Sequence, residues 1–194
     1  QVMRAGMEAG INFFDTAELY GTAGYLGEAM SGFHGEIVVT SKSMAQTYEG
    51  MEQSVLKTLK DLQRPYVDIM LLHAARFGPE LFEVFDGALQ CLLDYKKKGA
   101  IRAVGLSCHN VQGIARAAEL PDIDVVFPLN NVTGLGVLGG SRDEMTQAIA
   151  KCHQAGKGLY LMKALGGGTL AERYQEAMAF ARSMPGVAAQ AVGM

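Results

Sequence analysis

Short apolar segments rich in β-branched residues recur along the chain, and each is followed by a stretch with the spacing of an amphipathic helix. Within these segments the apolar residues run continuously, which is typical of parallel strands covered on both faces. The seven predicted strands are 11–16, 37–41, 67–73, 101–107, 125–129, 158–163 and 187–192. This repetition restricts the fold class to α/β.

The predicted helices lie between these strands. Apolar residues recur at every third or fourth position in 48–62 and in 80–98, so each range is expected to form one helix. The second ends in three lysines and Gly99, as a helix terminus should, and we interpret the lysine run as solvated. Ser141 and Glu144 have the spacing of a capping box, which predicts a further helix start.

Alternating strands and helices form either an open doubly wound sheet or a closed β/α barrel. A dinucleotide-binding doubly wound sheet would show a GxGxxG turn after its first strand, and none occurs there; the late glycines 166–168 are a weak signal. Repeated units without a shift in composition favour one barrel domain over 1–194. A complete (β/α)8 barrel needs about 250 residues. We therefore expect an incomplete TIM barrel.

The two ends of the sequence support the same expectation. The chain opens inside a predicted helix that runs to Gly10, and it closes on the predicted strand 187–192. We interpret this as a barrel whose first strand and last helix are missing. A barrel without one strand has unpaired edges, so the 194-residue segment alone is expected to be inactive.

Composition excludes several classes of function. A formal net charge of -3 gives no reason to expect nucleic-acid binding, and no apolar run approaches the length that spans a bilayer. The cysteines at 91, 108 and 152 are scattered, which argues against a disulfide framework and a metal knuckle. Reduced thiols of this kind indicate a cytoplasmic protein.

Ionisable residues interrupt the apolar pattern at the ends of three successive strands. Asp15 follows the first strand, Lys42 the second and His73 the third, while Tyr20 lies in the loop after Asp15. In β/α barrels the loops after the strands converge on one mouth, where the chemistry is found. We therefore expect these four side chains to form the catalytic site.

This combination suits proton transfer to an oxygen atom. A phenol with a pKa near 10 is a poor acid at neutral pH. We expect the Lys42 ammonium to lower the pKa of Tyr20, and the Asp15 carboxylate to keep that ammonium charged. A neutral imidazole at His73 could hold a carbonyl oxygen. The set contains no activated nucleophile, so it fits reduction by a hydride-carrying cofactor better than hydrolysis.

The string GINFFDTAELYG, at 10–21, resembles the aldo-keto reductase signature G-x-x-x-[FIL]-D-T-A-x-x-Y-G. The resemblance implies a (β/α)8 barrel that uses NADP(H) to reduce an aldehyde or ketone to an alcohol. It also implies that Tyr20 donates the proton, that Lys42 and Asp15 tune it, and that His73 orients the carbonyl. The expected partner is a small-molecule carbonyl substrate.

The same resemblance extends to the cofactor. The segment 105–110, GLSCHN, is similar to the family's G-x-S-N stretch, with Cys108 in the place of the asparagine. The residues expected to bind the cofactor are Ser107, Cys108, Asn130, Met162 and Lys163, with Asn131 as an alternative to Asn130. The sequence MKALGGG, from Met162, resembles a bacterial branch with a C-terminal iron–sulfur segment, which would lie beyond this sequence.

Two other functions remain open. The departure at Cys108 is compatible with a catalytically weak module that binds a nucleotide or a partner chain. A metal-dependent hydrolase would use Asp15, His73 and His109 as ligands. Taken singly, each candidate residue also has an ordinary structural role, such as a helix cap or a solvated lysine. Their joint placement at successive strand ends favours the reductase.

Overall fold

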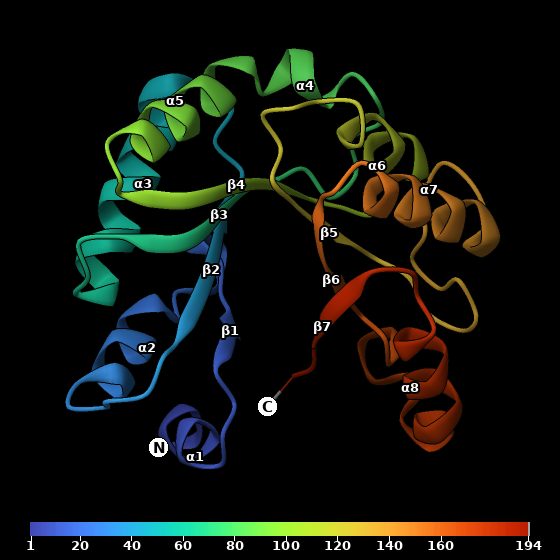
Figure 1. Cartoon of the computed structure of the whole chain (residues 1–194), viewed down its shortest axis with the longest axis horizontal. Coiled ribbons are helices and arrows are strands. Elements are labelled where there is room, and N and C mark those ends of the chain that lie inside the picture. Colours follow the sequence, from blue (N-terminus) through green and yellow to red (C-terminus); the bar gives the residue numbers. More distant parts are fainter. Residues whose placement is uncertain (194) are drawn as a thin grey trace. The chain divides into compact units, whose positions relative to one another are not determined.

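The computed structural model describes residues 1–193, whose elements are labelled along the chain in Figure 1. The strands are β1 (Phe13–Asp15), β2 (Val38–Ser43), β3 (Val67–His73), β4 (Ile101–Cys108), β5 (Val125–Pro128), β6 (Gly158–Met162) and β7 (Val187–Ala191). The α-helices are α1 (Val2–Glu8), α2 (Ala23–Met30), α3 (Tyr48–Leu62), α4 (Leu81–Val84), α5 (Asp86–Lys97), α6 (Val111–Ala117), α7 (Arg142–Gln154) and α8 (Tyr174–Arg182). Short 3₁₀ turns are η1 (Glu18–Tyr20), η2 (Gly166–Gly168) and η3 (Ala171–Arg173).

The strands form one sheet in the order of the chain, β1 to β7. The pairs β1·β2, β2·β3, β4·β5, β5·β6 and β6·β7 are parallel. A doubly wound sheet reverses its strand order at a switch point, whereas this sheet runs through without reversal. The order is that of a (β/α) barrel, so the predicted fold class is confirmed. Each predicted strand is present at its predicted place.

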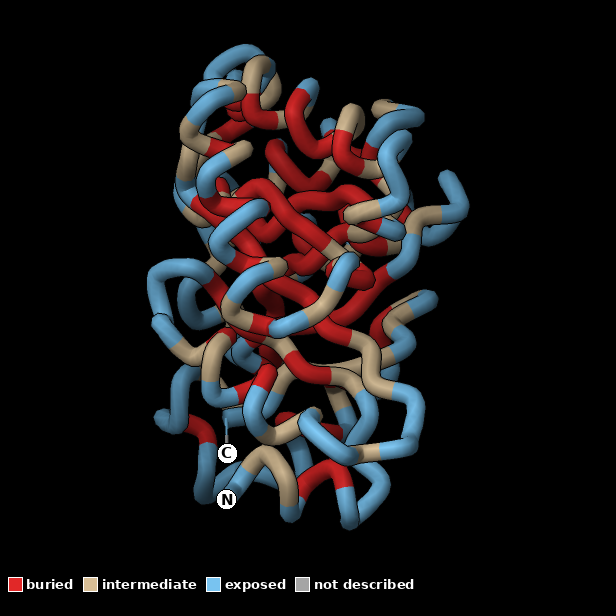
Figure 2. Tube along the Cα trace, turned by 90° about the vertical axis from the view of Figure 1, so that its left-hand side faces the viewer, coloured by how far each residue is buried: buried red, intermediate tan, exposed pale blue. Residues whose placement is uncertain are grey.

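The chain divides into two compact units. Unit 1 comprises 1–73 and 85–104, and unit 2 comprises 74–84 and 105–193. Figure 2 shows buried segments, in red, alternating with exposed helix faces and loops, in pale blue. Fully buried residues of unit 1 include Val39, Met51, Val55, Leu71 and Leu92; those of unit 2 include Leu106, Ile114, Val126, Ile149 and Leu161. The expectation of a single domain over 1–194 stays a prediction, and its last residue lies outside the described ones.

In unit 1, helix α2 packs closely against helix α3. Gly27 allows this approach, because a Cβ atom there would lie 2.4 Å from the carbonyl oxygen of Asp61. Gly24, one turn earlier on α2, faces open space. Helix α3 has the predicted bounds, with the Thr47 hydroxyl accepting from the backbone of Gly50 at 3.1 Å as its N-cap.

The helix predicted over 80–98 is wrong as one element, because the chain forms α4 and α5 with Phe85 between them. The first turn of α5 is tied to the loop before α3: the amide of Ala88 donates to the carbonyl of Gln46 at 3.2 Å. Gly87 abuts the backbone of Tyr48, since a Cβ atom at Gly87 would lie 3.1 Å from the Tyr48 nitrogen. These tertiary contacts fix the start of α5, which periodicity alone does not reveal.

In unit 2, the predicted capping box at the start of α7 is confirmed. The Ser141 hydroxyl accepts from the amide of Glu144 at 3.2 Å, and the Glu144 carboxylate accepts from the amide of Ser141 at 2.7 Å. The rings of Phe127 and Tyr160 stack with centroids 3.8 Å apart, joining β5 to β6.

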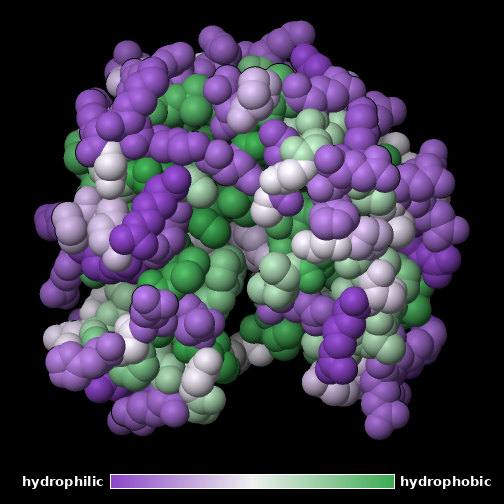
Figure 3. Space-filling model, viewed as in Figure 1, coloured by the Kyte–Doolittle hydropathy of each residue, from purple (hydrophilic) through white to green (hydrophobic). Residues whose placement is uncertain are grey.

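No helix among the described residues combines the length and apolarity needed to cross a membrane. Hydrophilic residues gather over α3 and α5 (Figure 3).

The contact at Gly27 generates a prediction about stability. Gly27→Ala should lower the free energy of unfolding by about 1–3 kcal/mol, because its methyl group would push α2 away from the backbone of α3. Gly24→Ala, on the same helix, should raise the free energy of unfolding by about 0.5–1 kcal/mol. Alanine has fewer backbone conformations than glycine in the unfolded chain, so less entropy is lost on folding. Urea unfolding of both variants measures this. Equal effects of the two substitutions would contradict the assigned packing.

Candidate active site

Unit 1 brings the four predicted catalytic side chains to the carboxyl ends of three neighbouring strands. Asp15 is the last residue of β1, Lys42 lies near the end of β2, and His73 is the last residue of β3. Tyr20 is carried by η1, which follows β1 after two residues. The parallel registers Asp15↔Thr40 and Lys42↔Leu71 place these ends side by side.

Lys42 is the most deeply buried of the four, with a relative exposure of 2%. Its ammonium donates to Asp15 Oδ2 at 2.7 Å and to the carbonyl of Thr16 at 2.8 Å. An unpaired ammonium in such a position would cost several kcal/mol, so both acceptors are needed to hold it there. This pair ties the end of β1 to the end of β2.

Tyr20 lies between an ammonium and an imidazole. The Lys42 Nζ atom is 4.9 Å from the centroid of the Tyr20 ring, and the ring of His73 meets it edge to face with centroids 6.4 Å apart. Half of Tyr20 remains exposed, at 51%. Gly21 ends the turn in the left-handed conformation, with φ of 64°, which an L side chain adopts rarely. The Tyr20 ring thus contacts Lys42 and His73 of unit 1, while about half of its side chain stays exposed to solvent.

The electrostatic balance at this site differs from the predicted one. Burial lowers the pKa of Lys42, and the Asp15 carboxylate opposes that shift. Burial also raises the pKa of Tyr20, and the negative charge of Asp15 raises it further. The expectation that Lys42 lowers the pKa of Tyr20 is therefore wrong. The pKa is raised because the phenol is partly desolvated and lies near the Asp15 carboxylate.

One polar side chain at this site was not singled out from the sequence. Glu18 is the first residue of η1, and its Oε2 atom accepts from the hydroxyls of Ser43, at 2.6 Å, and Ser54, at 2.8 Å. It occupies a variable position of the family signature, so the motif itself gives no hint of these contacts.

Unit 2 brings the predicted cofactor residues to the carboxyl ends of β4, β5 and β6. Ser107 and Cys108 end β4, Asn130 follows β5, and Met162 ends β6 just before Lys163. Bridges join the strand ends: Cys108↔Pro128 between β4 and β5, and Leu129↔Met162 after them. The roles of these predicted residues in cofactor binding stay predictions.

Two of these residues make contacts within the protein. Asn130 is fully buried, and its amide donates to the carbonyl of Arg142 at 3.2 Å and to the hydroxyl of Thr146 at 3.0 Å. The Cys108 thiol donates to the carbonyl of Phe77 at 3.4 Å. Burial raises the pKa of this thiol to about 11, so it is neutral and unreactive at physiological pH.

Lys163 and the loop after it have an unusual backbone. Lys163 has φ of 58°, and Gly166, Gly167 and Gly168 all have positive φ as well. Lys163 is exposed, and nothing lies within 4 Å of a Cβ placed on Gly167 or Gly168. The amide of Gly166 donates to the carbonyl of Lys163 at 2.8 Å, and that of Gly168 to the carbonyl of Leu165 at 2.9 Å. The loop is therefore closed by its own hydrogen bonds, and the ammonium of Lys163 is its exposed charge.

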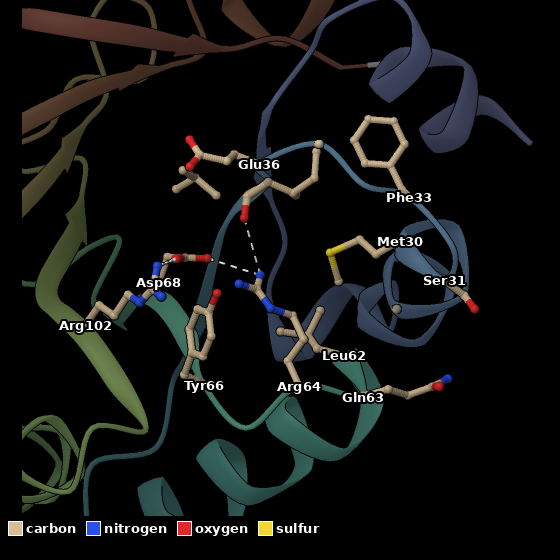
Figure 4. A pocket seen from close by; sticks show the side chains of 14 residues that line it. Met30, Ser31, Phe33, Glu36, Leu62, Gln63, Arg64, Tyr66, Asp68 and Arg102 are labelled. Carbon is tan, nitrogen blue, oxygen red and sulfur yellow. Dashed lines mark hydrogen bonds and ion pairs between the residues drawn. The ribbon is translucent and has the colours of Figure 1, made fainter.

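A cavity of about 650 Å³ in unit 1 lies at the starts of the strands. Arg64 and Arg102 converge on Asp68, at 3.2 Å and 2.9 Å, and both guanidinium groups pack on the ring of Tyr66 (Figure 4). None of the predicted site residues lines it. Because barrel chemistry belongs to the opposite ends of the strands, we interpret this cluster as stabilising the sheet.

Among residues 1–193, no group of three or more His, Cys, Asp or Glu side chains is arranged to hold a metal ion. The metal-dependent alternative therefore has no support in the part of the chain that is described.

Comparison with known proteins decides the family. The model of the "Aldo/keto reductase family" matches residues 1–186. The chain belongs to the aldo/keto reductase family. The family predicted from the segment 10–21 is thus confirmed.

The relatives of this chain agree with that assignment. Methylglyoxal reductase DkgA of Escherichia coli O157:H7 is 22% identical over 181 residues, which are 89% of this chain and 64% of the relative. The chain thus spans less than two thirds of that relative's length. A Pseudomonas aeruginosa protein, provisionally assigned as an aldo-keto reductase, is 26% identical with a TM-score of 0.84 over 100% of this chain and 76% of its own.

An aldo-keto reductase from Klebsiella pneumoniae, solved in complex with NADPH, has the same fold. Its TM-score is 0.73 at 21% identity, covering 98% of this chain and 72% of that protein. This likeness supports the (β/α) barrel fold of the chain.

The Asp15 carboxylate generates a prediction about Tyr20. In Asp15→Asn the pKa of Tyr20 should fall, because the substitution removes a negative charge that raises it. The phenolate absorbance of the variant, after subtraction of the same variant carrying Tyr20→Phe, measures this pKa. Asp61→Asn, on α3, is the matched control and should leave the titration of Tyr20 unchanged. An unchanged titration in Asp15→Asn would refute the assigned cause.

Proposed function

We propose that the protein reduces an aldehyde or ketone to the corresponding alcohol with NADP(H), and that Tyr20 donates the proton. The observation that carries this proposal is the phenol of Tyr20, half exposed beside the buried ammonium of Lys42 and the ring of His73. These side chains can place a proton at an oxygen atom, and none of them is an activated nucleophile.

The raised pKa of Tyr20 is compatible with this role. Hydride addition to a carbonyl carbon leaves an alkoxide, which is a much stronger base than a phenolate. A phenol of raised pKa therefore still protonates it, and the proton remains on Tyr20 until the alkoxide forms. The exposed side of the ring allows the phenolate to recover its proton from solvent. The same shift disfavours the reverse reaction, in which a phenolate must accept a proton.

The neighbouring side chains have distinct roles in the proposed reaction. His73, edge to face with Tyr20, can hold the carbonyl oxygen near the phenol. The Lys42 ammonium lies 4.9 Å from the centroid of the Tyr20 ring and helps to hold the phenol in place. Asp15 keeps the ammonium in place through the 2.7 Å contact.

We assign the binding of a nicotinamide dinucleotide to residues of unit 2. The exposed Lys163 supplies a cation for phosphate oxygens. Ser107, at the end of β4, and Met162, at the end of β6, are the proposed contacts of the nicotinamide, together with Cys108 and Asn130. When bound, the cofactor supplies the hydride.

The proposed substrate is a small-molecule carbonyl compound. The relative named a methylglyoxal reductase motivates methylglyoxal as the first compound to assay. A cytoplasmic location and an iron–sulfur segment stay predictions.

The second candidate is a binding module with little turnover. The buried, neutral Cys108 in a position where the family has asparagine favours it. Binding of NADPH without its oxidation by any carbonyl in a panel would support this candidate over the reductase.

The assigned proton donor is tested by Tyr20→Phe in the full-length protein. We expect kcat for carbonyl reduction to fall by about 100-fold or more, because the variant lacks the proton donor. NADPH binding should stay within about twofold of the parent. Tyr25→Phe, which alters an exposed tyrosine on α2, is the matched control. Equal turnover by Tyr20→Phe and the parent would refute the assignment.

The alkaline pH profile tests the charge at Lys42. Because burial lowers the pKa of Lys42, the ammonium should lose its proton below the ordinary lysine value. We expect kcat to be constant through neutral pH and to fall at a pH below 10.5, the ordinary lysine value. Lys57→Gln, on α3, should leave the profile unchanged. A profile that falls only above 10.5 would contradict the direction of the shift.

A further inference from the structure

We infer that Glu18 is a positioning residue, whose carboxylate fixes η1 against the end of β2 and so sets the place of the Tyr20 hydroxyl. This inference rests on the proposed reductase function. It assigns no contact with substrate to Glu18 and concerns only how the turn is held.

The carboxylate of Glu18 joins three elements of unit 1. Its Oε2 atom accepts from Ser43, at the end of β2, and from Ser54, on α3, at 2.6 Å and 2.8 Å. The two hydroxyl oxygens lie 2.9 Å apart and are both buried. Glu18 itself is exposed as a residue, so its carboxylate reaches inward to two buried hydroxyls.

The hydrogen count favours an ionised carboxylate as the centre of this cluster. Each serine hydroxyl has one hydrogen to donate. The Ser43 oxygen already accepts from the amide of Ala45 at 3.1 Å, which leaves its hydrogen for Glu18. The Ser54 hydroxyl lies 3.1 Å from the carbonyl of Gly50 but only 2.8 Å from Glu18 Oε2, so Glu18 is its nearer acceptor. Hydrogen bonds to a charged acceptor are stronger than neutral ones, so the carboxylate organises both hydroxyls.

The position of Glu18 is transmitted to Tyr20 through one short turn. Glu18 is the first residue of η1 and Tyr20 the last. The amide of Gly21 donates to the carbonyl of Glu18 at 3.2 Å, and that of Tyr20 to the carbonyl of Ala17 at 3.0 Å. These bonds make the turn a compact body. A displacement of Glu18 therefore displaces the phenol.

The anchor is also adjacent to the ammonium. Ser43 directly follows Lys42 on β2, and successive side chains of a strand point to opposite faces. Lys42 thus reaches Asp15 from one face while Ser43 holds Glu18 from the other. The distance of Tyr20 from Lys42 depends on both contacts.

The test uses two ways of removing the anchor in the full-length protein. Glu18→Gln removes the charge, and the double variant Ser43→Ala with Ser54→Ala keeps the charge but removes both donors. We expect each to lower kcat about tenfold with KM within about twofold, because the phenol is misplaced. The pKa of Tyr20, measured from its phenolate absorbance, should fall toward 10.0 as the loosened turn exposes the ring.

Two controls separate positioning from general stability. Glu28→Gln, which removes an exposed carboxylate of α2, should leave kcat and the titration of Tyr20 unchanged. The triple variant, which combines Glu18→Gln with both serine substitutions, should lower kcat no further than Glu18→Gln or the double serine variant does. The reason is that all three substitutions remove the same anchor. Variants that lower the melting temperature, but keep the parent's kcat and Tyr20 titration, would overturn the inference.

Failure of the proposed function is recognised separately. If the parent protein reduces no carbonyl, the reductase proposal fails, and the titration of Tyr20 alone decides the role of Glu18. A fall in the pKa of Tyr20 in both the Glu18 and the serine variants would then support positioning. An unchanged pKa would overturn it.

Discussion

The contact between the Lys42 ammonium and the Asp15 carboxylate is the constraint on which the candidate active site depends. A cation with 2% exposure is stable only where acceptors surround it, and Asp15 Oδ2 and the Thr16 carbonyl lie at 2.7 Å and 2.8 Å. Both acceptors belong to the chain that leaves β1. The burial of one ammonium on β2 therefore dictates where the end of β1 lies, and η1 continues from there with Tyr20.

The same pair explains why Tyr20 is a weaker acid than a free phenol. A cation beside a phenol would favour the phenolate, but this cation already has a carboxylate in contact. Burial is the largest cause of the raised pKa of Tyr20, and the negative charge of Asp15 raises it further. The pair thus holds the ammonium near Tyr20 without acidifying it, which suits a donor whose acceptor becomes basic only during the reaction.

Much of this arrangement follows from sequence, and the reasons are local. Parallel strands covered on both faces need continuous apolar runs, so the seven strands and their order could be predicted. The residues Asp15, Lys42 and His73 interrupt those runs at the strand ends, which located the candidate site. The break at Phe85 could not be predicted, because it depends on contacts of α5 with the backbone near Tyr48. The sign of the shift at Tyr20 was missed because it depends on burial.

The contacts of Glu18 show what a motif cannot reveal. Its partners Ser43 and Ser54 are 25 and 36 positions away, so no local pattern connects them. They meet because successive side chains of β2 point to opposite faces of the sheet, so that Lys42 lies on one face and Ser43 on the other. A slip of one residue in the register Asp15↔Thr40 would exchange these faces and bring a hydroxyl where the ammonium now lies. The register of β2 therefore specifies the charged pair and the anchor of η1 together.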